Sequence, residues 1–331
     1  MPKVMITPTS MQHRPSPFAG LLERAGFEVR YPTNPELVMG LTGDEETIRQ
    51  LKGIEAIIAG GEYFTPAVLD GLPELRVIAR AGVGFDRVDV AAATRRGIPV
   101  TVTPSANHEA VAEHAITLLL ATVRSIVSTS RQIAAGRWPR RTLGTVREKT
   151  LGIVGLGRIG RSTAVRAIPL GMKVVAHEIF PDQEFVRAHG IELLSFEQLL
   201  ERSDFITLHC PLTDRTRHFF GKEAFDRMKP GSILINTARG PLVNETDLLE
   251  ALRSGRLRAA GLDVMEQEPP DPDNPLLRMA NVLVTSHQAG GDEASVIAMG
   301  MEAAECVIAL WQGDWPEGAV INDELKSGWK W

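Results

Sequence analysis

The sequence has 331 residues, of which 44% are hydrophobic and 23% charged, with a formal net charge of −5 at pH 7. This length predicts about two domains, each able to bury its own core. The acidic balance, without a long basic run, gives no reason to expect a nucleic-acid partner. Cys210 and Cys306 lack metal-type spacing, so reduced thiols in a cytoplasmic protein are expected. Because a strand-like run begins at residue 3, we expect no leader peptide, and we expect no membrane-spanning run.

Strands and helices alternate over roughly the first hundred residues. We expect strands at residues 4–7, 27–31, 56–59, 76–79 and 99–102, and helices at residues 18–24, 45–52, 66–69 and 91–96. This alternation predicts a parallel sheet with helices on its faces. An apolar stripe then predicts one long helix over residues 107–133. That helix is either a crossover that serves a subunit interface or a buried domain helix, and the pattern favours neither.

The second half of the chain repeats the alternation. Strands are expected at residues 151–154, 172–176, 205–208, 232–236, 259–262 and 282–285. One helix is expected to end at residue 169, and further helices are expected at residues 196–201, 222–228 and 245–254. Residues 150–288 are therefore predicted to form a six-stranded dinucleotide-binding domain. A helix over residues 293–311 is expected to return to the first domain.

Three glycines directly follow the strand at residues 151–154. Gly155 would permit the tight turn, Gly157 the approach of a pyrophosphate, and Gly160 close packing of the following helix. The N–H groups at the start of that helix suit anionic phosphates. Glu178, 18 positions beyond Gly160, would accept hydrogen bonds from the adenosine ribose and repel a 2′-phosphate. The pattern therefore favours NAD binding over a purely structural glycine turn.

Three residues with suitable chemistry lie near the carboxyl ends of predicted strands, where parallel sheets place their working groups. Arg239 offers a permanently charged, two-pronged donor for a carboxylate and a neighbouring carbonyl oxygen. His287 can exchange a proton near neutral pH, and Glu268 could orient its ring and favour its charged form. Taken singly, each could be an ordinary surface or packing residue. Together they predict reduction of a 2-oxo acid, with His287 as the proton donor.

Several segments resemble the signatures of the D-isomer-specific 2-hydroxyacid dehydrogenase family. The segments are KPGSILINTARG at 229–240, GLGRIG at 155–160, GLDVMEQEP at 261–269, NPLLRMANVLVTSHQAGG at 274–291, RAGVGFDRVD at 80–89 and NHEAVAEHA at 107–115. Their order and spacing cover nearly the whole chain.

This resemblance implies an α/β fold of two Rossmann-like domains with parallel sheets and a cleft between them. Residues 1–104 and 289–331 would form the substrate-binding domain, and residues 105–288 the NAD-binding domain with the crossover helix. The resemblance also implies a homodimer formed through that helix. The implied catalytic residues are Arg239, Glu268 and His287. The implied cofactor contacts are Gly155, Gly157, Arg158, Ile159, Gly160, Glu178, Thr207, Pro211, Thr237, Ala238 and Asp263, and the implied substrate contacts are Arg80, Val83, Gly84, Arg239 and His287.

The chain departs from the family pattern where the substrate would bind. Ser286 and Gln288 replace the usual proline and isoleucine beside His287. Arg80 matches an arginine of the phosphoglycerate dehydrogenases, whereas Glu62 would repel a phosphate. We also expect none of the C-terminal regulatory domain that many phosphoglycerate dehydrogenases carry. A small acid such as hydroxypyruvate or glyoxylate is slightly favoured over phosphoglycerate, and the physiological direction stays open.

Two further functions stay open at this point. Some relatives are NADH-sensing corepressors that retain all three catalytic residues, and the same scaffold could oxidise formate or phosphonate. Among the histidines, we expect His209 to lie near the cofactor. We expect no metal site, because no cluster has metal-ligand spacing. His108 and His114 are expected on different faces of one helix. The remaining histidines are expected at the surface or in packing contacts: His13, His177, His189 and His218.

Overall fold

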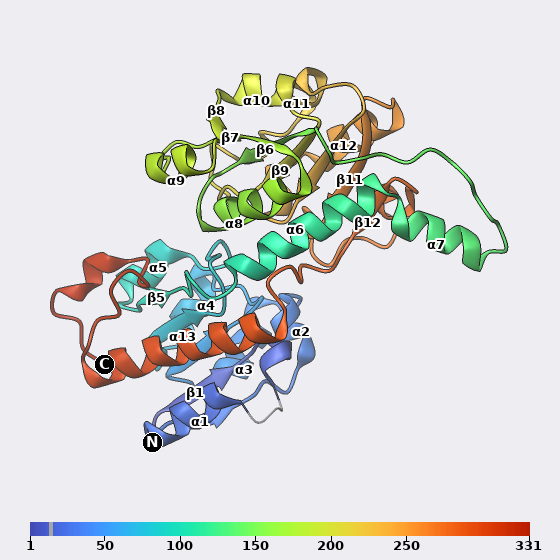
Figure 1. The fold of residues 1–331 in the computed structure, drawn as a ribbon. Helices are drawn as coiled ribbons and strands as arrows, with labels where there is room; N and C mark the ends of the chain where they lie inside the picture. Colours follow the sequence, from blue (N-terminus) through green and yellow to red (C-terminus); the bar gives the residue numbers. More distant parts are fainter. Residues whose placement is uncertain (13–15) are drawn as a thin grey trace. The chain divides into compact units, whose positions relative to one another are not determined.

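The computed structural model describes residues 1–12 and 16–331, so the expectation for His13 lies outside the described residues. The chain divides into two compact units (Figure 1). The first comprises Met1–Asn107 and Gly291–Trp331, and the second His108–Gly290. The boundaries expected at residues 104 and 288 stand three and two positions before those of the units.

The first unit contains a parallel sheet that has five strands in the described part of the chain, in the order β2-β1-β3-β4-β5. Its strands are β1 (Lys3–Ile6), β2 (Glu28–Arg30), β3 (Ala56–Ala59), β4 (Val77–Arg80) and β5 (Val100–Thr101). Its helices are α1 (Pro17–Arg24), α2 (Pro35–Met39), α3 (Asp44–Leu51), α4 (Pro66–Asp70), α5 (Val90–Arg95) and α13 (Glu293–Gln312), with 3-10 turns η1 (Thr9–Met11) and η5 (Asp323–Lys326). All the expected elements of this unit are present, and the short α2 is an addition.

Side chains alternate between the two faces of this sheet, as the strand period requires. On β3, Ala56 and Ile58 enter the cluster that contains α1 and α13, whereas Ile57 and Ala59 enter the opposite one. Helix α13 is long and apolar enough to cross a membrane, and within the described residues it alone passes that test by itself. Half of its apolar window is buried, where it packs on α1, β3 and β4. The apolar composition of α13 is therefore explained by its place in this core.

The second unit, described throughout, contains a parallel sheet in the order β12-β11-β10-β9-β6-β7-β8. Its strands are β6 (Thr150–Val154), β7 (Lys173–His177), β8 (Glu192–Leu193), β9 (Phe205–Leu208), β10 (Ser232–Asn236), β11 (Leu257–Leu262) and β12 (Val282–Val284). Its helices are α6 (His108–Val123), α7 (Ile126–Ala134), α8 (Arg158–Ala167), α9 (Gln183–Ala188), α10 (Phe196–Arg202), α11 (Lys222–Arg227) and α12 (Glu245–Arg253), with 3-10 turns η2 (Ile168–Leu170), η3 (Gly240–Leu242) and η4 (Pro275–Arg278). The expectation of six strands was wrong. The seventh strand, β8, has two residues, and the first of them is exposed, so no apolar run in the sequence indicates this strand.

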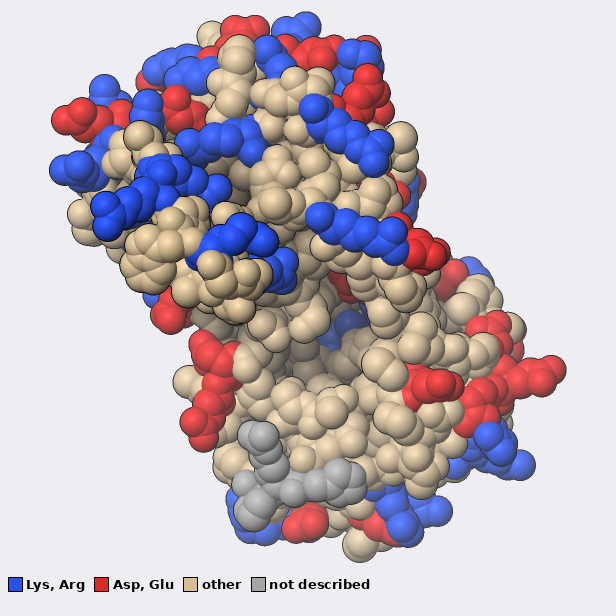
Figure 2. All heavy atoms as spheres, turned by 90° about the vertical axis from the view of Figure 1, so that its right-hand side faces the viewer, with Lys and Arg blue, Asp and Glu red and all other residues tan. Residues whose placement is uncertain are grey.

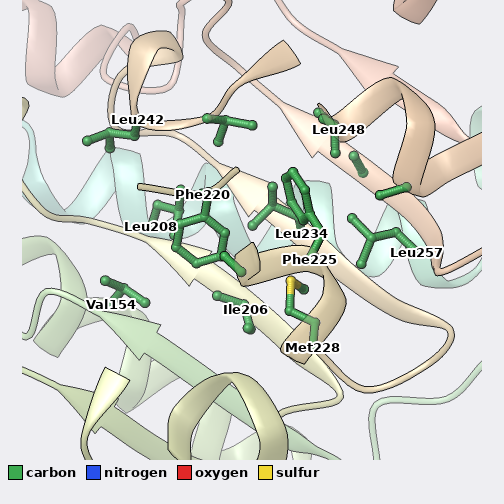
Figure 3. Close-up of a cluster of buried hydrophobic side chains, with 14 of the residues drawn as sticks. Val154, Ile206, Leu208, Phe220, Phe225, Met228, Leu234, Leu242, Leu248 and Leu257 are labelled. Atoms are coloured by element: carbon green, nitrogen blue, oxygen red, sulfur yellow. The ribbon is translucent and has the colours of Figure 1, made fainter. Parts of the chain in front are cut away.

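Two apolar clusters cover the faces of this second sheet. On β10, Ile233 and Ile235 face the cluster that contains α6 and α8, while Leu234 faces the other. Figure 3 shows that second cluster, in which Phe220 and Phe225 pack over the central strands β9 and β10. These cores fix the strands, and with them the loops that follow their carboxyl ends.

The expected continuous helix over residues 107–133 was also wrong. Helix α6 ends at Val123 and α7 starts at Ile126, with an angle of 56° between them. Ser125 causes the break because its φ of +52° is left-handed, a conformation that cannot continue a right-handed helix. Of the two alternatives for this segment, α6 matches the buried domain helix, since it packs on α8, β10 and β11. None of the residues of α7 is buried.

Candidate active site

The glycine-rich turn joins β6 to α8 in the second unit. Gly155 has a φ of +94°, and a Cβ there would contact the backbone of His209 and Cys210. A Cβ on Gly160 would collide with the carbonyl oxygen of Gly155, so only glycine permits this packing of helix on strand. A Cβ on Gly157 would meet no described atom within 4 Å. The turn is therefore closely packed at Gly155 and Gly160 and open at Gly157, as a bound pyrophosphate requires.

Glu178 follows β7 and lies beside this turn. Its Oε2 accepts a hydrogen bond from the amide of Leu156 at 2.7 Å, and its Oε1 accepts from the amides of Ile179 and Phe180 at 2.8 and 2.9 Å. Each carboxylate oxygen has more than one lone pair, so ribose hydroxyls can still donate to it. The carboxylate thus holds the turn and is placed to select a ribose without a 2′-phosphate.

Two buried polar atoms close to this edge of the sheet have no hydrogen-bond partner among the described residues: the Thr237 hydroxyl and Nδ1 of His209. The other ring nitrogen of His209 lies 3.0 Å from the Thr207 hydroxyl and 3.3 Å from that of Thr163. Burial lowers the pKa of His209 to about 3, so the ring is neutral at physiological pH. Orphaned polar atoms beside an open glycine turn fit a dinucleotide that would supply their partners.

The other residues expected at the cofactor differ in exposure. Thr207 is buried beneath His209, and Ala238 is half-buried. Arg158, Ile159 and Pro211 begin α8 or follow β9, and each is at least partly exposed. Cys210 is a free thiol whose pKa burial raises to about 12, with the nearby charge of Glu178 adding to the effect. A thiol held protonated in this way is a poor nucleophile.

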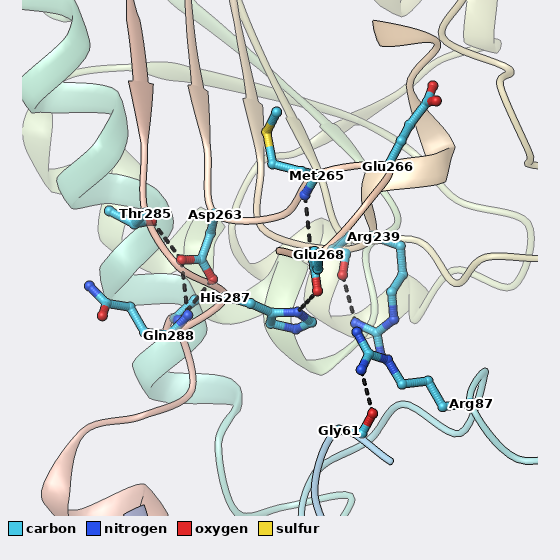
Figure 4. A network of polar contacts seen from close by, with 12 residues as sticks. Gly61, Arg87, Arg239, Asp263, Met265, Glu266, Glu268, Thr285, His287 and Gln288 are labelled. Carbon is cyan, nitrogen blue, oxygen red and sulfur yellow. Dashed lines mark hydrogen bonds and ion pairs between the residues drawn. The ribbon is translucent and has the colours of Figure 1, made fainter. Parts of the chain in front are cut away.

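His287 and Glu268 form a hydrogen-bonded pair beyond the carboxyl ends of β12 and β11 (Figure 4). Nδ1 of His287 lies 2.8 Å from Oε2 of Glu268, with 46% of the His287 side chain and 21% of the Glu268 side chain exposed. The other carboxylate oxygen of Glu268 accepts from the amide of Met265 at 3.1 Å. Because the carboxylate occupies Nδ1, the Nε2 atom remains for a substrate.

The backbone of His287 has a left-handed φ of +50°, uncommon for a residue with a side chain. Its amide donates to the carbonyl oxygen of Asp263 at 2.7 Å, which holds this conformation. The Asp263 carboxylate, which is completely buried, accepts from the amides of Gln288 and Ala289 and from the hydroxyl of Thr285. Asp263 is therefore placed to fix the loop that carries His287, and its expected contact with the cofactor stays a prediction.

His114, on α6, completes this network. Its Nε2 lies 3.1 Å from the Thr285 hydroxyl and 3.4 Å from Oδ1 of Asp263. Burial by itself would raise the pKa of Asp263, but hydrogen bonds from His114, Thr285 and two backbone amides outweigh it and lower the pKa below its usual value. Sequence reasoning assigned no role to His114 or Thr285, because only the fold brings α6 next to the end of β12. Among the described residues no group of three His, Cys, Asp or Glu side chains could hold a metal.

Arg239 lies in the loop after β10, three residues beyond Asn236. The Asn236 side chain donates to the carbonyl oxygen of Arg239 at 2.8 Å and accepts from the amide of Ala238 at 3.0 Å. A Cβ on the next residue, Gly240, would collide with the backbone of Met265. The loop that carries Arg239 therefore packs directly on the loop that leads to Glu268. The fold thus brings all three expected catalytic residues to one edge of the second unit.

In the first unit, the expected substrate contacts follow β4. Arg80 ends this strand, and its Nε donates to the carbonyl oxygen of Gly84 at 3.1 Å. Gly82, with a φ of +143°, makes the turn, and Val83 is exposed at its tip. The loop thus presents backbone at the carboxyl edge of its own sheet.

Comparison with known proteins shows the family to which the chain is similar. Residues 116–289, or 174 of the 331 residues, match the family model "D-isomer specific 2-hydroxyacid dehydrogenase, NAD binding domain". A D-3-phosphoglycerate dehydrogenase from Archaeoglobus fulgidus is 42% identical over 272 residues, which are 81% of this chain and 52% of that protein. A glyoxylate reductase from Korarchaeum cryptofilum is 41% identical over 286 residues, which are 84% of this chain and 86% of that protein. The chain therefore spans about half the length of the first relative and most of the second.

A solved structure shares the fold of the chain. The D-lactate dehydrogenase from Aquifex aeolicus, crystallised with NAD and lactic acid, is 28% identical, with a TM-score of 0.82 over 96% of this chain and 98% of that one. The cofactor of the second unit is accordingly NAD. On the family model and the extent of the match to the glyoxylate reductase, the chain belongs to the D-isomer specific 2-hydroxyacid dehydrogenase family.

Proposed function

We propose that the chain is an NAD-dependent D-2-hydroxyacid dehydrogenase that interconverts a small 2-oxo acid, such as hydroxypyruvate or glyoxylate, and the corresponding 2-hydroxy acid. The observation that carries this proposal is the His287–Glu268 pair, 2.8 Å apart at the edge of the nucleotide-binding sheet. When bound, NADH supplies the hydride that reduces the carbonyl carbon. The remaining chemistry, transfer of one proton and stabilisation of charge on oxygen, is within the reach of the side chains of this chain.

His287 would donate the proton. With Nδ1 held by Glu268, the Nε2–H of the doubly protonated ring gives its proton to the carbonyl oxygen as the carbon receives the hydride. The Glu268 carboxylate stabilises the charged ring before transfer and keeps its orientation afterwards. In the opposite direction the same Nε2 accepts the proton of the hydroxyl group.

Arg239 would bind the substrate carboxylate and polarise the neighbouring carbonyl group, since its guanidinium carries a permanent charge and paired donors. In the first unit, the backbone of Val83 and Gly84 is proposed to contact the substrate. The exposed tip at Val83 and the turn at Gly82 support this assignment.

A second candidate is D-3-phosphoglycerate dehydrogenase activity. The 42% identity with the Archaeoglobus fulgidus enzyme favours it. The two candidates share cofactor and proton donor and differ in whether the substrate carries a phosphate group. They can therefore be separated by substrate alone.

The test is steady-state oxidation of NADH with glyoxylate, hydroxypyruvate and 3-phosphohydroxypyruvate, followed by the absorbance of NADH. We expect turnover with at least one unphosphorylated acid. Preference for the phosphorylated acid would support the second candidate. Absence of turnover with all three acids, together with tight NADH binding, would contradict an enzyme and favour an NADH-sensing corepressor.

We also propose a cytoplasmic homodimer, assembled through α7 and the segment that follows it. Helix α7 has no buried residue, and Ile126, Ile133 and Trp138 are exposed, Trp138 to 74%. Figure 2 views the molecule from the side on which α7 lies in Figure 1, and lysine and arginine side chains gather over the upper part of that face. Sedimentation analysis of the wild type and of Ile126→Glu would test the dimer. An unchanged monomer mass for both proteins would contradict it.

A further inference from the structure

Helix α6 places one histidine beside the loop that carries His287, and the proposed reaction gives that histidine no step. Nε2 of His114 lies 3.1 Å from the Thr285 hydroxyl and 3.4 Å from Oδ1 of Asp263, with 20% of the His114 side chain exposed. Thr285 directly follows β12 and Asp263 directly follows β11, and α6 packs against both strands. The packing of the domain core therefore sets this contact.

The hydrogen bonds of this group run in one direction, from the histidine ring to the carboxylate. Burial raises the pKa of Asp263, but hydrogen bonds, first from His114 and then from Thr285, outweigh burial and lower it. The ionised carboxylate can only accept hydrogen bonds. The Thr285 hydroxyl has a single proton, which it donates to Oδ1 of Asp263 at 2.6 Å. Its oxygen must therefore accept from His114, so the His114 ring carries a proton on Nε2.

Asp263 in turn holds the loop of His287 through three backbone amides. Its carboxylate accepts from the amides of Gln288 and Ala289 at 3.1 and 2.8 Å, and its carbonyl oxygen accepts from the amide of His287 at 2.7 Å. The left-handed φ of +50° at His287 is unfavourable for a residue with a side chain and persists only where the surroundings fix it. The direction of the His287 ring therefore depends on the position of Asp263.

We propose that His114 is a positioning residue for the reaction: its ring holds the Asp263 carboxylate in place and thereby fixes the conformation of His287. This inference rests on the proposed function. Displacement of a reacting group by about 1 Å can cost 10²-fold in rate, even when the change lies away from the chemistry. Loss of the His114 donor should cost less than this, because Thr285 and two backbone amides still bind the carboxylate.

Two substitutions separate the donor of His114 from the bulk of its ring. His114→Leu removes the donor, whereas His114→Gln brings a side-chain amide N–H near the position of Nε2 and can still donate to Thr285. His189→Leu is the matched control, since His189 is exposed in the same unit and its ring bonds the carbonyl oxygen of Phe185. For each protein, kcat and KM are measured with the 2-oxo acid that the wild type uses best. The concentration of active sites is taken from NADH binding, so unfolded protein is not counted.

His114→Leu should lower kcat about tenfold and leave the affinity for NADH within about twofold of the wild type. His114→Gln should keep at least about half of the wild-type kcat, and His189→Leu should keep all of it. A purely structural role would lower the amount of folded protein but not kcat per NADH site. An unchanged kcat per site in His114→Leu, or an equal loss in His114→Gln, overturns the inference. Should His114→Leu fail to fold, Thr285→Val, which removes the linking hydroxyl, decides by the same criterion.

Hydrogen exchange tests the positioning without turnover. The amides of residues 287–289 bond to Asp263, so a peptide covering residues 285–290 should be protected in the wild type. In His114→Leu this peptide should exchange about threefold faster or more, and in His189→Leu at the wild-type rate. Equal exchange in the wild type and His114→Leu overturns the inference. Faster exchange in His114→Leu, with a wild type that turns over none of the acids, would support the positioning of His287 and overturn the proposed function alone.

Discussion

Two histidine–glutamate pairs in the second unit look alike and differ in what they leave unused. His218 and His287 both have a left-handed backbone, with φ of +55° and +50°. Nε2 of His218 lies 3.1 Å from Glu266, and Nδ1 of His287 lies 2.8 Å from Glu268. The side chains of both histidines are partly exposed, 41% for His218 and 46% for His287. Neither charge, exposure nor backbone strain therefore separates them.

The two pairs differ in the backbone amide from which each carboxylate accepts its other hydrogen bond. Glu266 accepts from the amide of Glu245, at the start of α12, so this pair joins a loop to a helix. Glu268 accepts from the amide of Met265 within its own loop and leaves Nε2 of His287 for other partners. Figure 4 shows the Glu268 carboxylate directed at the His287 ring and that of Glu266 directed away from it. An acid–imidazole pair thus indicates catalysis only where the outer nitrogen is left for a substrate.

The largest effect is expected from replacing the two histidines. General acid catalysis contributes roughly 10²- to 10⁴-fold, so His287→Asn should lower kcat about 10³-fold. His218→Asn should leave kcat within about twofold of the wild type, because its ring only joins two structural segments. Both variants should bind NADH as the wild type does. The measurement is kcat for the 2-oxo acid together with NADH affinity from fluorescence titration.

A similar loss of turnover in both histidine variants would remove the distinction between the pairs. Loss of NADH binding in His287→Asn would show instead that the ring supports the cofactor site.

Replacing the two glutamates should affect kcat in the same order, with a larger loss at Glu268 than at Glu266, and both effects should be smaller than those of the histidine variants. Glu268→Gln removes the charge that stabilises the doubly protonated His287 ring, and kcat should fall on the order of 10²-fold. Glu266→Gln should leave kcat within about twofold of the wild type. Equal activities for the two variants, measured at saturating NADH, would contradict a role for Glu268 in proton transfer.

The site could be anticipated from sequence as far as local patterns reach. Arg239 and His287 follow apolar runs that become β10 and β12, so the order of strands placed both at one edge. The glycine turn was equally predictable, because Gly155 and Gly160 leave no room for a side chain and Gly157 leaves the turn open. Short apolar strands and obligatory glycines depend on residues that are close together in the chain, so the sequence alone can predict them.

Other features depend on long-range contacts. The break at Ser125 carries no helix-stopping proline or glycine, so periodicity continued the helix through it. Burial of Asp263 against His114 joins the residue that follows β11 to a residue of α6, and nothing near either residue predicts their contact. Chemistry that arises from packing requires the fold.

His209 extends the comparison to a histidine without a carboxylate partner. Its folded pKa of about 3 lies below the unfolded value near 6.5, so the unfolded chain binds a proton that the folded protein does not. Stability should therefore fall as pH drops from about 6.5 toward 3, by up to about 1.4 kcal/mol per pH unit from this residue. Urea unfolding of the wild type and His209→Gln at pH 5 and 7 measures the effect. The variant should lose less stability on acidification, and an equal loss would contradict a buried neutral ring.

The smallest effect concerns the stability that the His218–Glu266 pair contributes. Both side chains are partly exposed, and exposed ion pairs typically contribute about 0.2–1 kcal/mol. In a double-mutant cycle of His218→Gln and Glu266→Gln, the coupling measured by urea unfolding should lie in this range and weaken as salt is added. Turnover should remain unchanged in all four proteins. A coupling above about 2 kcal/mol would be typical of a buried ion pair and would contradict this prediction. It would also mean that the pair differs from His287–Glu268 in solvation, although their geometries are alike.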